Sequence, residues 1–181
     1  MTKLHIFLPM HKLPKIDKTF KALIITLSDR ASKGEYEDRS GPVVKEHLSK
    51  FFKEEELSYE TKSVIIPDDA NDLKTLITES CRSKIDFIFT TGGTGIGKRD
   101  ITVDTVQPML DKEIPGVMEH IRIKYGSEKP NALLSRGIAG VINESLIYTL
   151  PGSVKAVNEY MTEILKTMYH LYFMLHGIDV H

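Results

Sequence analysis

Short apolar runs and amphipathic stretches alternate along the first half of the chain. Three runs rich in β-branched or aromatic residues predict strands over residues 21–28 (KALIITLS), 59–67 (YETKSVIIP) and 85–91 (IDFIFTT). The segments between them carry apolar residues at helical spacing and predict helices over residues 40–55, with Ser40 as a possible cap, and 69–84. This strand–helix–strand–helix–strand order predicts right-handed crossovers and a mostly parallel sheet.

The second half of the chain predicts further helices and a pair of strands. Two helices are expected at about 103–112 and 115–125, followed by a loop or short turn over residues 129–137. Two short strands around Asn143-Glu144 come next and end at Pro151-Gly152. The final segment repeats apolar residues at spacings of three and four, which fits a helix on a sheet or a coiled-coil seam: Val154, Val157, Met161, Ile164, Met168, Leu171 and Leu175.

Length and composition favour one globular domain without a membrane span. The 181 residues suit a domain over residues 21–178 with an N-terminal arm over residues 1–20, either loose or docked on the body. A net charge of −1 gives no overall attraction to nucleic acid or anionic membranes, so an anion site must be built locally. The single Cys81 excludes an internal disulfide and fits a reducing cytoplasm. There is no apolar run of about 18 residues.

Small, hydroxyl and acidic residues follow the predicted strands. In an open parallel sheet, ligands bind beyond the carboxyl ends of the strands, so these positions are the first candidates for a site. The four segments that we expect to meet at this edge are Ser28-Asp29-Arg30, Pro67-Asp68-Asp69, Thr90 to Gly95, and Pro151-Gly152.

The sharpest of these segments is the glycine-rich run TTGGTGIGKR. Gly92 to Lys98 has the spacing of a nucleotide-binding P-loop, but Arg99 stands where the magnesium-binding Ser or Thr is needed. The run also lacks the register of a dinucleotide fingerprint. Glycines between a buried strand and a helix beginning near Thr102 predict a nest of N–H groups for a phosphate. The alternative is a flexible turn that needs glycine only for its geometry.

Two aspartates are candidates for holding a cation near this loop. Asp100 lies just past the loop, and Asp68 lies at the end of the neighbouring strand. Magnesium commonly takes one or two protein carboxylates, with water and substrate phosphates completing its shell. The structural alternatives are that Asp100 caps a helix or pairs with Arg99, and that Asp68 caps the helix beginning near Ala70.

The run TTGGTGIGKRDIT resembles the signature of the MogA/MoaB family of molybdenum-cofactor biosynthesis. Five further segments over most of residues 21–165 resemble that family in the same order: SDRASKGEYEDRSGP, IIPDD, EIPGVMEHIR, ALLSRGIAGVI and LIYTLPGSVKAV. The resemblance implies a three-layer α/β sandwich, with a mostly parallel central sheet flanked by helices. It also implies a homotrimer, or a dimer of trimers in the MoaB-like branch, with a molybdenum-insertion protein as a candidate partner.

The opening and IPDD segments are most similar to the molybdopterin adenylyltransferase branch. That branch is implied to move AMP from ATP onto the terminal phosphate of molybdopterin, with Mg²⁺ and release of pyrophosphate. Position by position, the resemblance assigns catalysis and magnesium binding to Asp68 and Asp100, and substrate binding to Ser28, Gly92, Gly93, Thr94, Gly95, Ser135, Pro151 and Gly152.

The chain departs from the family pattern at Thr102–Thr105 (TVDT) and at Pro151–Val154 (PGSV), which leaves the branch open. A MoaB-like paralogue with another activity, or a scaffold that only binds the pterin, are therefore alternatives. A general NTP-hydrolysing domain is disfavoured because Lys98 is not followed by Ser or Thr.

Overall fold

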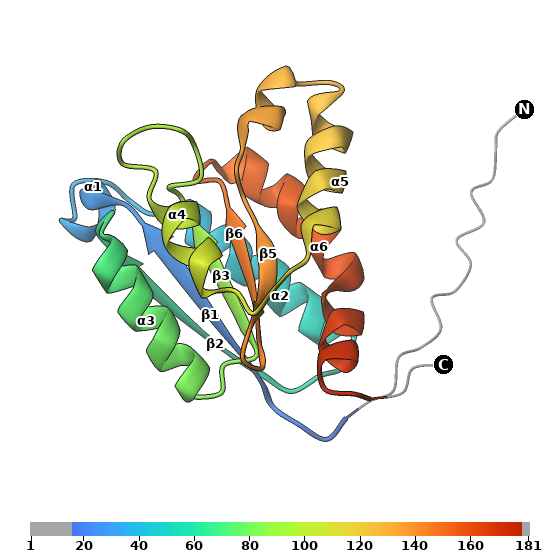
Figure 1. Cartoon of the computed structure of the whole chain (residues 1–181). Helices are drawn as coiled ribbons and strands as arrows, with labels where there is room; N and C mark the ends of the chain where they lie inside the picture. Colours follow the sequence, from blue (N-terminus) through green and yellow to red (C-terminus); the bar gives the residue numbers. More distant parts are fainter. Residues whose placement is uncertain (1–15, 179–181) are drawn as a thin grey trace, which may run out of the picture.

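The computed structural model describes residues 16–178, which form one six-stranded sheet with helices on both faces (Figure 1). The strand order is β2-β1-β3-β6-β5-β4. The strands are β1 (Phe20–Leu27), β2 (Tyr59–Ile66), β3 (Phe87–Thr91), β4 (Lys112–Glu113), β5 (Ala139–Ile142) and β6 (Ser145–Leu150). The helices are α1 (Asp29–Ser32), α2 (Ser40–Glu54), α3 (Ala70–Arg82), α4 (Thr102–Val106), α5 (Pro115–Gly126) and α6 (Val154–Leu175), with 3-10 turns η1 (Gln107–Met109) and η2 (Pro130–Leu134).

Four strands run parallel, as the sequence order predicts. β1 pairs in parallel with β2 and β3, and β3 pairs in parallel with β6, whereas β5 pairs antiparallel with both of its neighbours, β6 and β4. In this register Thr26 lies beside Thr91, and Thr91 lies beside Leu150. The carboxyl ends of β1, β3 and β6 therefore meet at one edge of the sheet.

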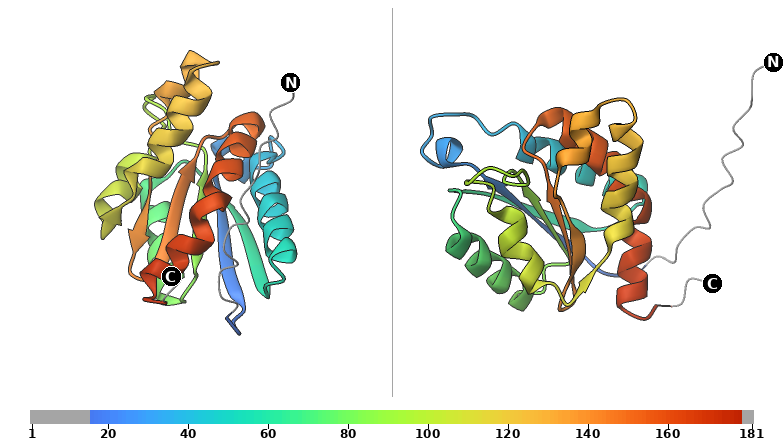
Figure 2. Two further views of the ribbon diagram at one scale, coloured as in Figure 1. Left: turned by 90° about the vertical axis from the view of Figure 1, so that its right-hand side faces the viewer. Right: turned by 45° about the horizontal axis from the view of Figure 1, so that its top comes forward.

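The core lies in two layers because both faces of the sheet are buried. Phe20, Ala22 and Ile24 of β1 pack into the apolar cluster under α2, α5 and α6. The alternating residues Leu23 and Ile25 pack into the cluster under α3 and α4. Figure 2 shows the sheet between these two groups of helices. The predicted three-layer α/β sandwich with a mostly parallel sheet is confirmed.

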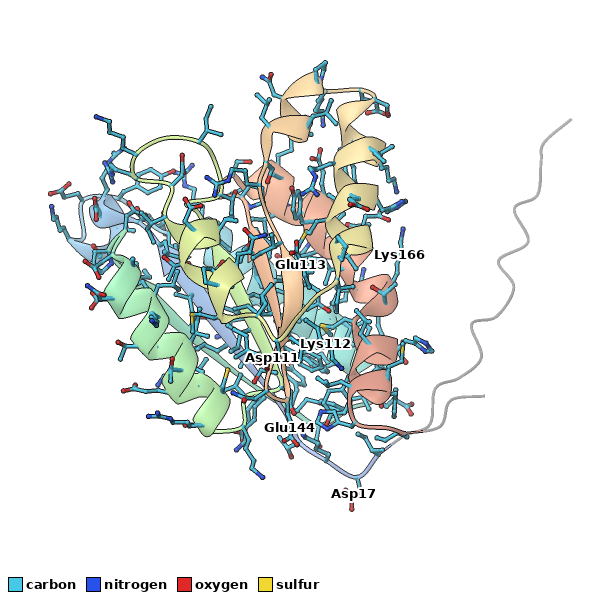
Figure 3. The ribbon with its side chains drawn as sticks, in the orientation of Figure 1. Asp17, Asp111, Lys112, Glu113, Glu144 and Lys166 are labelled. Carbon is cyan, nitrogen blue, oxygen red and sulfur yellow. The ribbon has the colours of Figure 1, made fainter. Side chains whose placement is uncertain are left out.

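The predicted helices α2, α3, α5 and α6 are confirmed, and α6 packs its apolar residues into the core. The helix expected over residues 103–112 is confirmed only for its first turn and is wrong beyond Val106. α4 ends at Val106, and a 3-10 turn containing Pro108 follows. Lys112–Glu113, both labelled in Figure 3, then pair with β5 as the edge strand. Proline lacks a backbone N–H and clashes with the preceding turn, so a helix does not continue through it.

Two residues that the sequence offered as possible helix caps are replaced in this role by a neighbouring aspartate. Ser40 is not the cap of α2, because Asp38 Oδ1 accepts the backbone N–H groups of Ser40 and Gly41 at 2.9 and 3.1 Å. Asp68 does not cap α3, since Asp69 accepts the N–H groups of Asn71 and Asp72 instead. These side chains satisfy N–H groups that have no partner inside the helix.

Residues 16–20 lie against the body of the domain. Ile16 packs on the core, and the Lys18 ammonium pairs with Asp86 and donates to the Tyr172 hydroxyl at 2.8 Å. The rest of the predicted arm, residues 1–15, lies outside the described residues. No helix in the described part of the chain is long and apolar enough to cross a membrane.

Candidate functional site

The carboxyl ends of the strands are joined by backbone hydrogen bonds. The N–H of Gly92, just after β3, donates to the Leu150 carbonyl of β6 at 3.0 Å. The N–H of Ser28, just after β1, donates to the Ile66 carbonyl of β2 at 3.0 Å. All four segments expected to meet at this edge therefore do so, and the segment between β3 and α4, residues 92–101, forms the glycine loop at its centre.

The first two glycines of the loop are required by close packing. Gly92 has φ +96°, and a Cβ there would lie 2.6 Å from the Leu27 carbonyl oxygen. Gly93 has φ +65°, and its Cβ would collide with the Thr102 hydroxyl. That hydroxyl donates to the Gly92 carbonyl at 2.8 Å. The start of the loop is thus packed between β1 and α4, and this geometry by itself requires the first two glycines.

The amino end of α4 does not supply the helix end that the sequence predicts for phosphate. α4 has five residues, and the Thr102 N–H already donates to the Gly93 carbonyl at 3.0 Å. The longer helix that begins at this edge is α6, whose Ser153 cap accepts the Ala156 N–H at 3.3 Å. The helix start beside the loop is therefore that of α6, which follows Pro151-Gly152.

A cavity of about 620 Å³ lies on the glycine loop and is called the main cavity below. It brings together eight of the ten predicted site residues: Gly92, Gly93, Thr94, Gly95, Asp100, Ser135, Pro151 and Gly152. Arg136 fixes the near wall by donating its N–H to the Thr94 carbonyl at 2.9 Å and by pairing with Asp104. The far wall comes from α6 and from the segment before η2, through Lys129, Lys155, Glu159 and Tyr160.

A second cavity of about 420 Å³ adjoins the main cavity, and the two share Gly152 and Ser153 as lining residues. Ser28 lines this second cavity and not the main one. Further hydroxyl residues line it, and the side-chain oxygens of Ser40 and Thr91 lie 2.9 Å apart. The predicted site residues thus divide between two neighbouring hollows.

Asp100 lies in the wall of the main cavity. Its Oδ2 accepts the Gly97 N–H at 2.7 Å, and a Cβ on Gly95 would lie 2.7 Å from the same oxygen. Neither structural alternative for Asp100 is correct, because Arg99 pairs elsewhere and Ile101 is the N-cap of α4. The carboxylate closes the glycine loop on itself and faces the hollow.

Asp68 is held outside both cavities by an arginine of the glycine loop. Arg99 Nη2 lies 2.9 Å from Asp68 Oδ2 and 2.7 Å from Asp29 Oδ2. The backbone N–H of each aspartate also donates to the carboxylate of the other, at 3.0 and 3.3 Å. Hydrogen bonding to Asp68 and the charge of Asp29 raise the pKa of Arg99. Arg99 stands where a P-loop would have Ser or Thr. Its side chain ties the glycine loop to the ends of β1 and β2.

The two aspartates do not belong to a larger cluster arranged to hold a metal ion. Within residues 16–178, no group of three or more His, Cys, Asp or Glu side chains is arranged to hold a metal ion. A cation at this edge would therefore depend on one or two carboxylates and on oxygens from substrate or water, which is the usual environment of magnesium.

The far wall of the main cavity was not predicted from the sequence. Lys155 and Glu159 are four residues apart, so they share one face of α6 beside its apolar seam. Their position directly after Pro151-Gly152 is a signal that could have identified them. Lys129 carries no such local signal, because only the packing of α5 and η2 brings it to the cavity.

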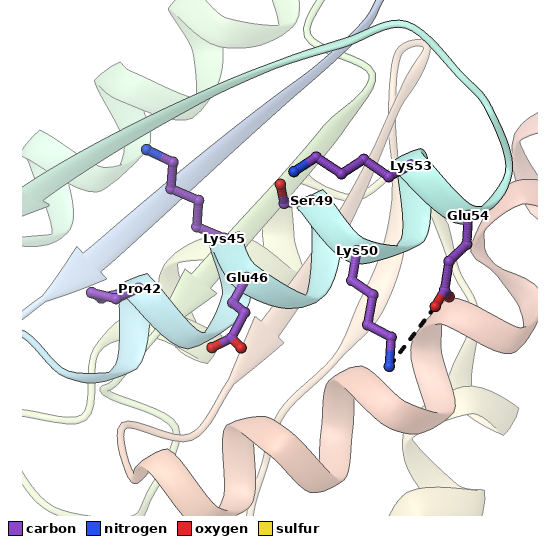
Figure 4. Close-up of a pocket in the computed structure, with 7 residues that line it drawn as sticks. All are labelled: Pro42, Lys45, Glu46, Ser49, Lys50, Lys53 and Glu54. Carbon is purple, nitrogen blue, oxygen red and sulfur yellow. Dashed lines mark ion pairs between the residues drawn. The ribbon is translucent and has the colours of Figure 1, made fainter.

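A third hollow of about 550 Å³ lies against the outer face of α2, far in sequence from the glycine loop (Figure 4). Its charged side chains come from one helix, and Lys50 pairs with Glu54 at 3.9 Å with both side chains exposed. This arrangement is that of a solvated helix face, and none of the predicted site residues lies there.

Comparison with known proteins agrees with the fold and the motifs. A family model described as "Probable molybdopterin binding domain" matches residues 23–170. The molybdopterin adenylyltransferase of Pyrococcus furiosus is 40% identical over 159 residues, covering 85% of this chain and 90% of that protein. Molybdenum cofactor biosynthesis protein B of Staphylococcus carnosus is 35% identical over 161 residues, covering 86% of this chain and 90% of that protein.

Solved structures show the same architecture. The crystal structure of the tungsten cofactor synthesizing protein MoaB from Pyrococcus furiosus has a TM-score of 0.77 and 36% identity, and the match covers 91% of this chain and all of that one. The strand ends, the glycine loop and these matches lead to one conclusion: the chain belongs to the MogA/MoaB family and has a role in molybdenum-cofactor biosynthesis.

Proposed function

We propose that this chain is a molybdopterin adenylyltransferase, which transfers AMP from ATP to the terminal phosphate of molybdopterin. The observation that carries the proposal is the pair of adjoining cavities, which share Gly152 and Ser153 beside the glycine loop. A reaction between two substrates needs both to be held side by side, and neighbouring hollows suit that requirement. A relative that is 40% identical bears the name of this activity.

The reaction asks the protein mainly to align two anionic groups. A phosphate oxygen of molybdopterin attacks the α-phosphorus of ATP, the bond from that phosphorus to the bridging oxygen breaks, and pyrophosphate leaves with the bonding electrons. The attacking oxygen is already ionised, so no general base is required. Backbone N–H groups of Gly93 to Gly95 would hold a phosphate, and fixed dipoles of this kind stabilise transferring phosphoryl groups.

Magnesium would be held at Asp100. Asp68 would contribute once the ion had replaced Arg99 as the partner of its carboxylate. Asp100 fits because it faces the main cavity next to the glycine loop. Asp68 does not face the cavity while Arg99 binds it. When bound, the ion would neutralise negative charge on the phosphates. Residues shared by the two cavities, Gly152 and Ser153, would lie between the two substrates.

The direct test is to incubate the protein with ATP, Mg²⁺ and molybdopterin and to measure adenylylated pterin and pyrophosphate. Equal amounts of both products are expected, and ATP should not be consumed without the pterin. Pterin binding with no product would contradict the proposal and favour the carrier. Consumption of ATP without pterin would favour an NTP-hydrolysing domain.

We also propose a homotrimer. Ile123 of α5 is 70% exposed, and Leu133 and Leu134 of η2 are 53% and 64% exposed. Figure 1 shows that α5 and η2 stand together beyond the sheet, so these apolar side chains lie on a projecting part of the molecule. Light scattering at micromolar concentration should give three times the mass of one chain, and a monomer would overturn this proposal.

A further inference from the structure

The far wall of the main cavity carries two lysines next to one carboxylate. Lys129 Nζ lies 2.6 Å from Glu159 Oε1, with side chains 41% and 17% exposed. Lys155 lines the same wall one helical turn before Glu159. The glycine loop and Asp100 line the cavity with them. Substrates entering this cavity would therefore meet a nest of N–H groups and a pair of ammonium groups.

The two ammonium groups are close enough to influence each other. Contact with Lys129 and the positive charge of Lys129 lower the pKa of Lys155, whereas the hydrogen bond to Glu159 raises the pKa of Lys129. Glu159 and Glu128 both act on this pair of lysines, but of these two carboxylates only Glu159 lines the main cavity. An anion entering the cavity could therefore replace Glu159 and be bound by charge-assisted hydrogen bonds.

A second glutamate on the same helix shows what a structural ion pair looks like in this protein. Glu163 is 4% exposed and accepts from Lys124 at 2.7 Å and Lys166 at 2.8 Å, with His120 at 3.2 Å. This cluster connects α5 to α6, and none of its members lines the main cavity. The connection between the helices therefore does not depend on Glu159, which faces the cavity.

We propose that Lys129 and Lys155 form a second phosphate-binding site in the main cavity, and that Glu159 occupies the lysines until a substrate phosphate replaces it. This inference deepens the proposed function, because both of its substrates carry phosphates. The shared chemistry is a phosphate or polyphosphate group, from the nucleotide or from the pterin. Glu159 acts on the site through the lysines and has no contact of its own with the phosphate.

The test measures binding of inorganic pyrophosphate by calorimetry, which needs no catalysis. Lys129→Gln and Lys155→Gln should each weaken binding by about tenfold, the scale of one charge-assisted hydrogen bond. Glu159→Gln should tighten binding severalfold, because it removes the competing anion. A purely structural role for Glu159 predicts the opposite pattern, with lower stability and unchanged or weaker binding, and that result would overturn the proposal.

Two lysines provide matched controls. Lys124→Gln removes the same charge from the Glu163 cluster and should lower the melting temperature without changing pyrophosphate affinity. Lys50→Gln removes one positive charge from an exposed i,i+4 pair outside the cavity, and it should change neither the melting temperature nor the pyrophosphate affinity. If Lys50→Gln weakens binding as much as Lys155→Gln, the effect is general charge attraction and the assigned site is wrong.

Two further titrations identify the source of the phosphate. If Lys155→Gln weakens ATP binding and leaves molybdopterin binding unchanged, the site takes the nucleotide polyphosphate, and the reverse result assigns it to the pterin phosphate. No effect on either substrate overturns the proposal. Failure of the wild-type protein to form adenylylated pterin, with lysine-dependent pyrophosphate binding intact, would contradict the proposed function and support this second site.

Discussion

Arg99 and Asp68 form an ion pair of 2.9 Å that joins the glycine loop to the end of β2. One of the two carboxylates predicted to bind magnesium is therefore already neutralised, while the other, Asp100, faces the main cavity. Asp29 completes the contact at 2.7 Å from the same guanidinium nitrogen. The glycine loop, which borders the main cavity, is thus tied directly to the carboxylate at the end of the neighbouring strand.

Asp68→Asn and Asp100→Asn should each lower adenylyl transfer by at least about a hundredfold, the scale of losing one preorganised electrostatic contact in a transition state. Molybdopterin binding should persist, because the phosphate would rest on backbone groups of the glycine loop. Rate, pterin affinity and melting temperature should be measured on the same preparations. A variant that melts early and keeps its rate would show that its carboxylate is structural.

Arg99→Gln should free Asp68 and reduce the Mg²⁺ concentration needed for half-maximal activity. Arg99 is 67% exposed, so the loss of stability should be small. Lys98→Gln, next to it in the chain, makes the same change in charge and is the control. An unchanged Mg²⁺ requirement in Arg99→Gln would separate Asp68 from the metal site.

Glu163 should make the free energy of unfolding depend on pH in the acid range. Burial alone raises its pKa, but hydrogen bonds from Lys124 and Lys166 outweigh this and lower it to about 2 from a usual 4.5. Because the folded-state pKa is depressed, the stabilisation is complete above about pH 4.5 and is lost as the pH falls toward 2. Glu163→Gln should cost roughly 2 kcal/mol at pH 7.

Chemical unfolding of both proteins at several pH values checks this expectation. The difference in unfolding free energy between wild type and Glu163→Gln should shrink steadily between about pH 4.5 and pH 2. A difference that stays constant across this range would mean that the ion pairs of Glu163 are not the source of the effect.

Tyr148→Phe should not destabilise the protein and should gain up to about 1 kcal/mol, because an unpaired buried hydroxyl is unfavourable. Tyr148 is fully buried on β6, its ring stacks on Phe89 at 5.2 Å, and its hydroxyl has no hydrogen-bond partner among the described residues. Burial raises its pKa accordingly.

Tyr59→Phe is the matched comparison for Tyr148→Phe. The Tyr59 hydroxyl lies 2.6 Å from the Ser49 hydroxyl, so removing it should cost about 1 kcal/mol. The unfolding free energy measured in urea should therefore rise or stay unchanged for Tyr148→Phe and fall for Tyr59→Phe. A loss of stability in Tyr148→Phe equal to that of Tyr59→Phe would show that the Tyr148 hydroxyl has a partner in solution.

Local patterns were sufficient for most of the fold and for one wall of the site. The alternation of buried strands with amphipathic helices is a short-range signal, and parallel strands placed together bring their carboxyl ends to one edge. The glycine loop, Asp100 and Pro151-Gly152 were identifiable for that reason, since each directly follows a strand or the loop itself. The helix expected through Pro108 failed because its segment ends as an edge strand paired with β5.

The tertiary structure alone decided what these residues meet. Asp68 and Arg99 are 31 positions apart, and no local pattern indicates that the loop arginine pairs with this aspartate. Lys129 and Glu159 are 30 positions apart and approach only because α5 packs on α6 around the buried Glu163. Sequence spacing predicts which side chains share a strand end or a helix face. Packing between elements determines which charges become partners, because those contacts depend on how separate segments are brought together.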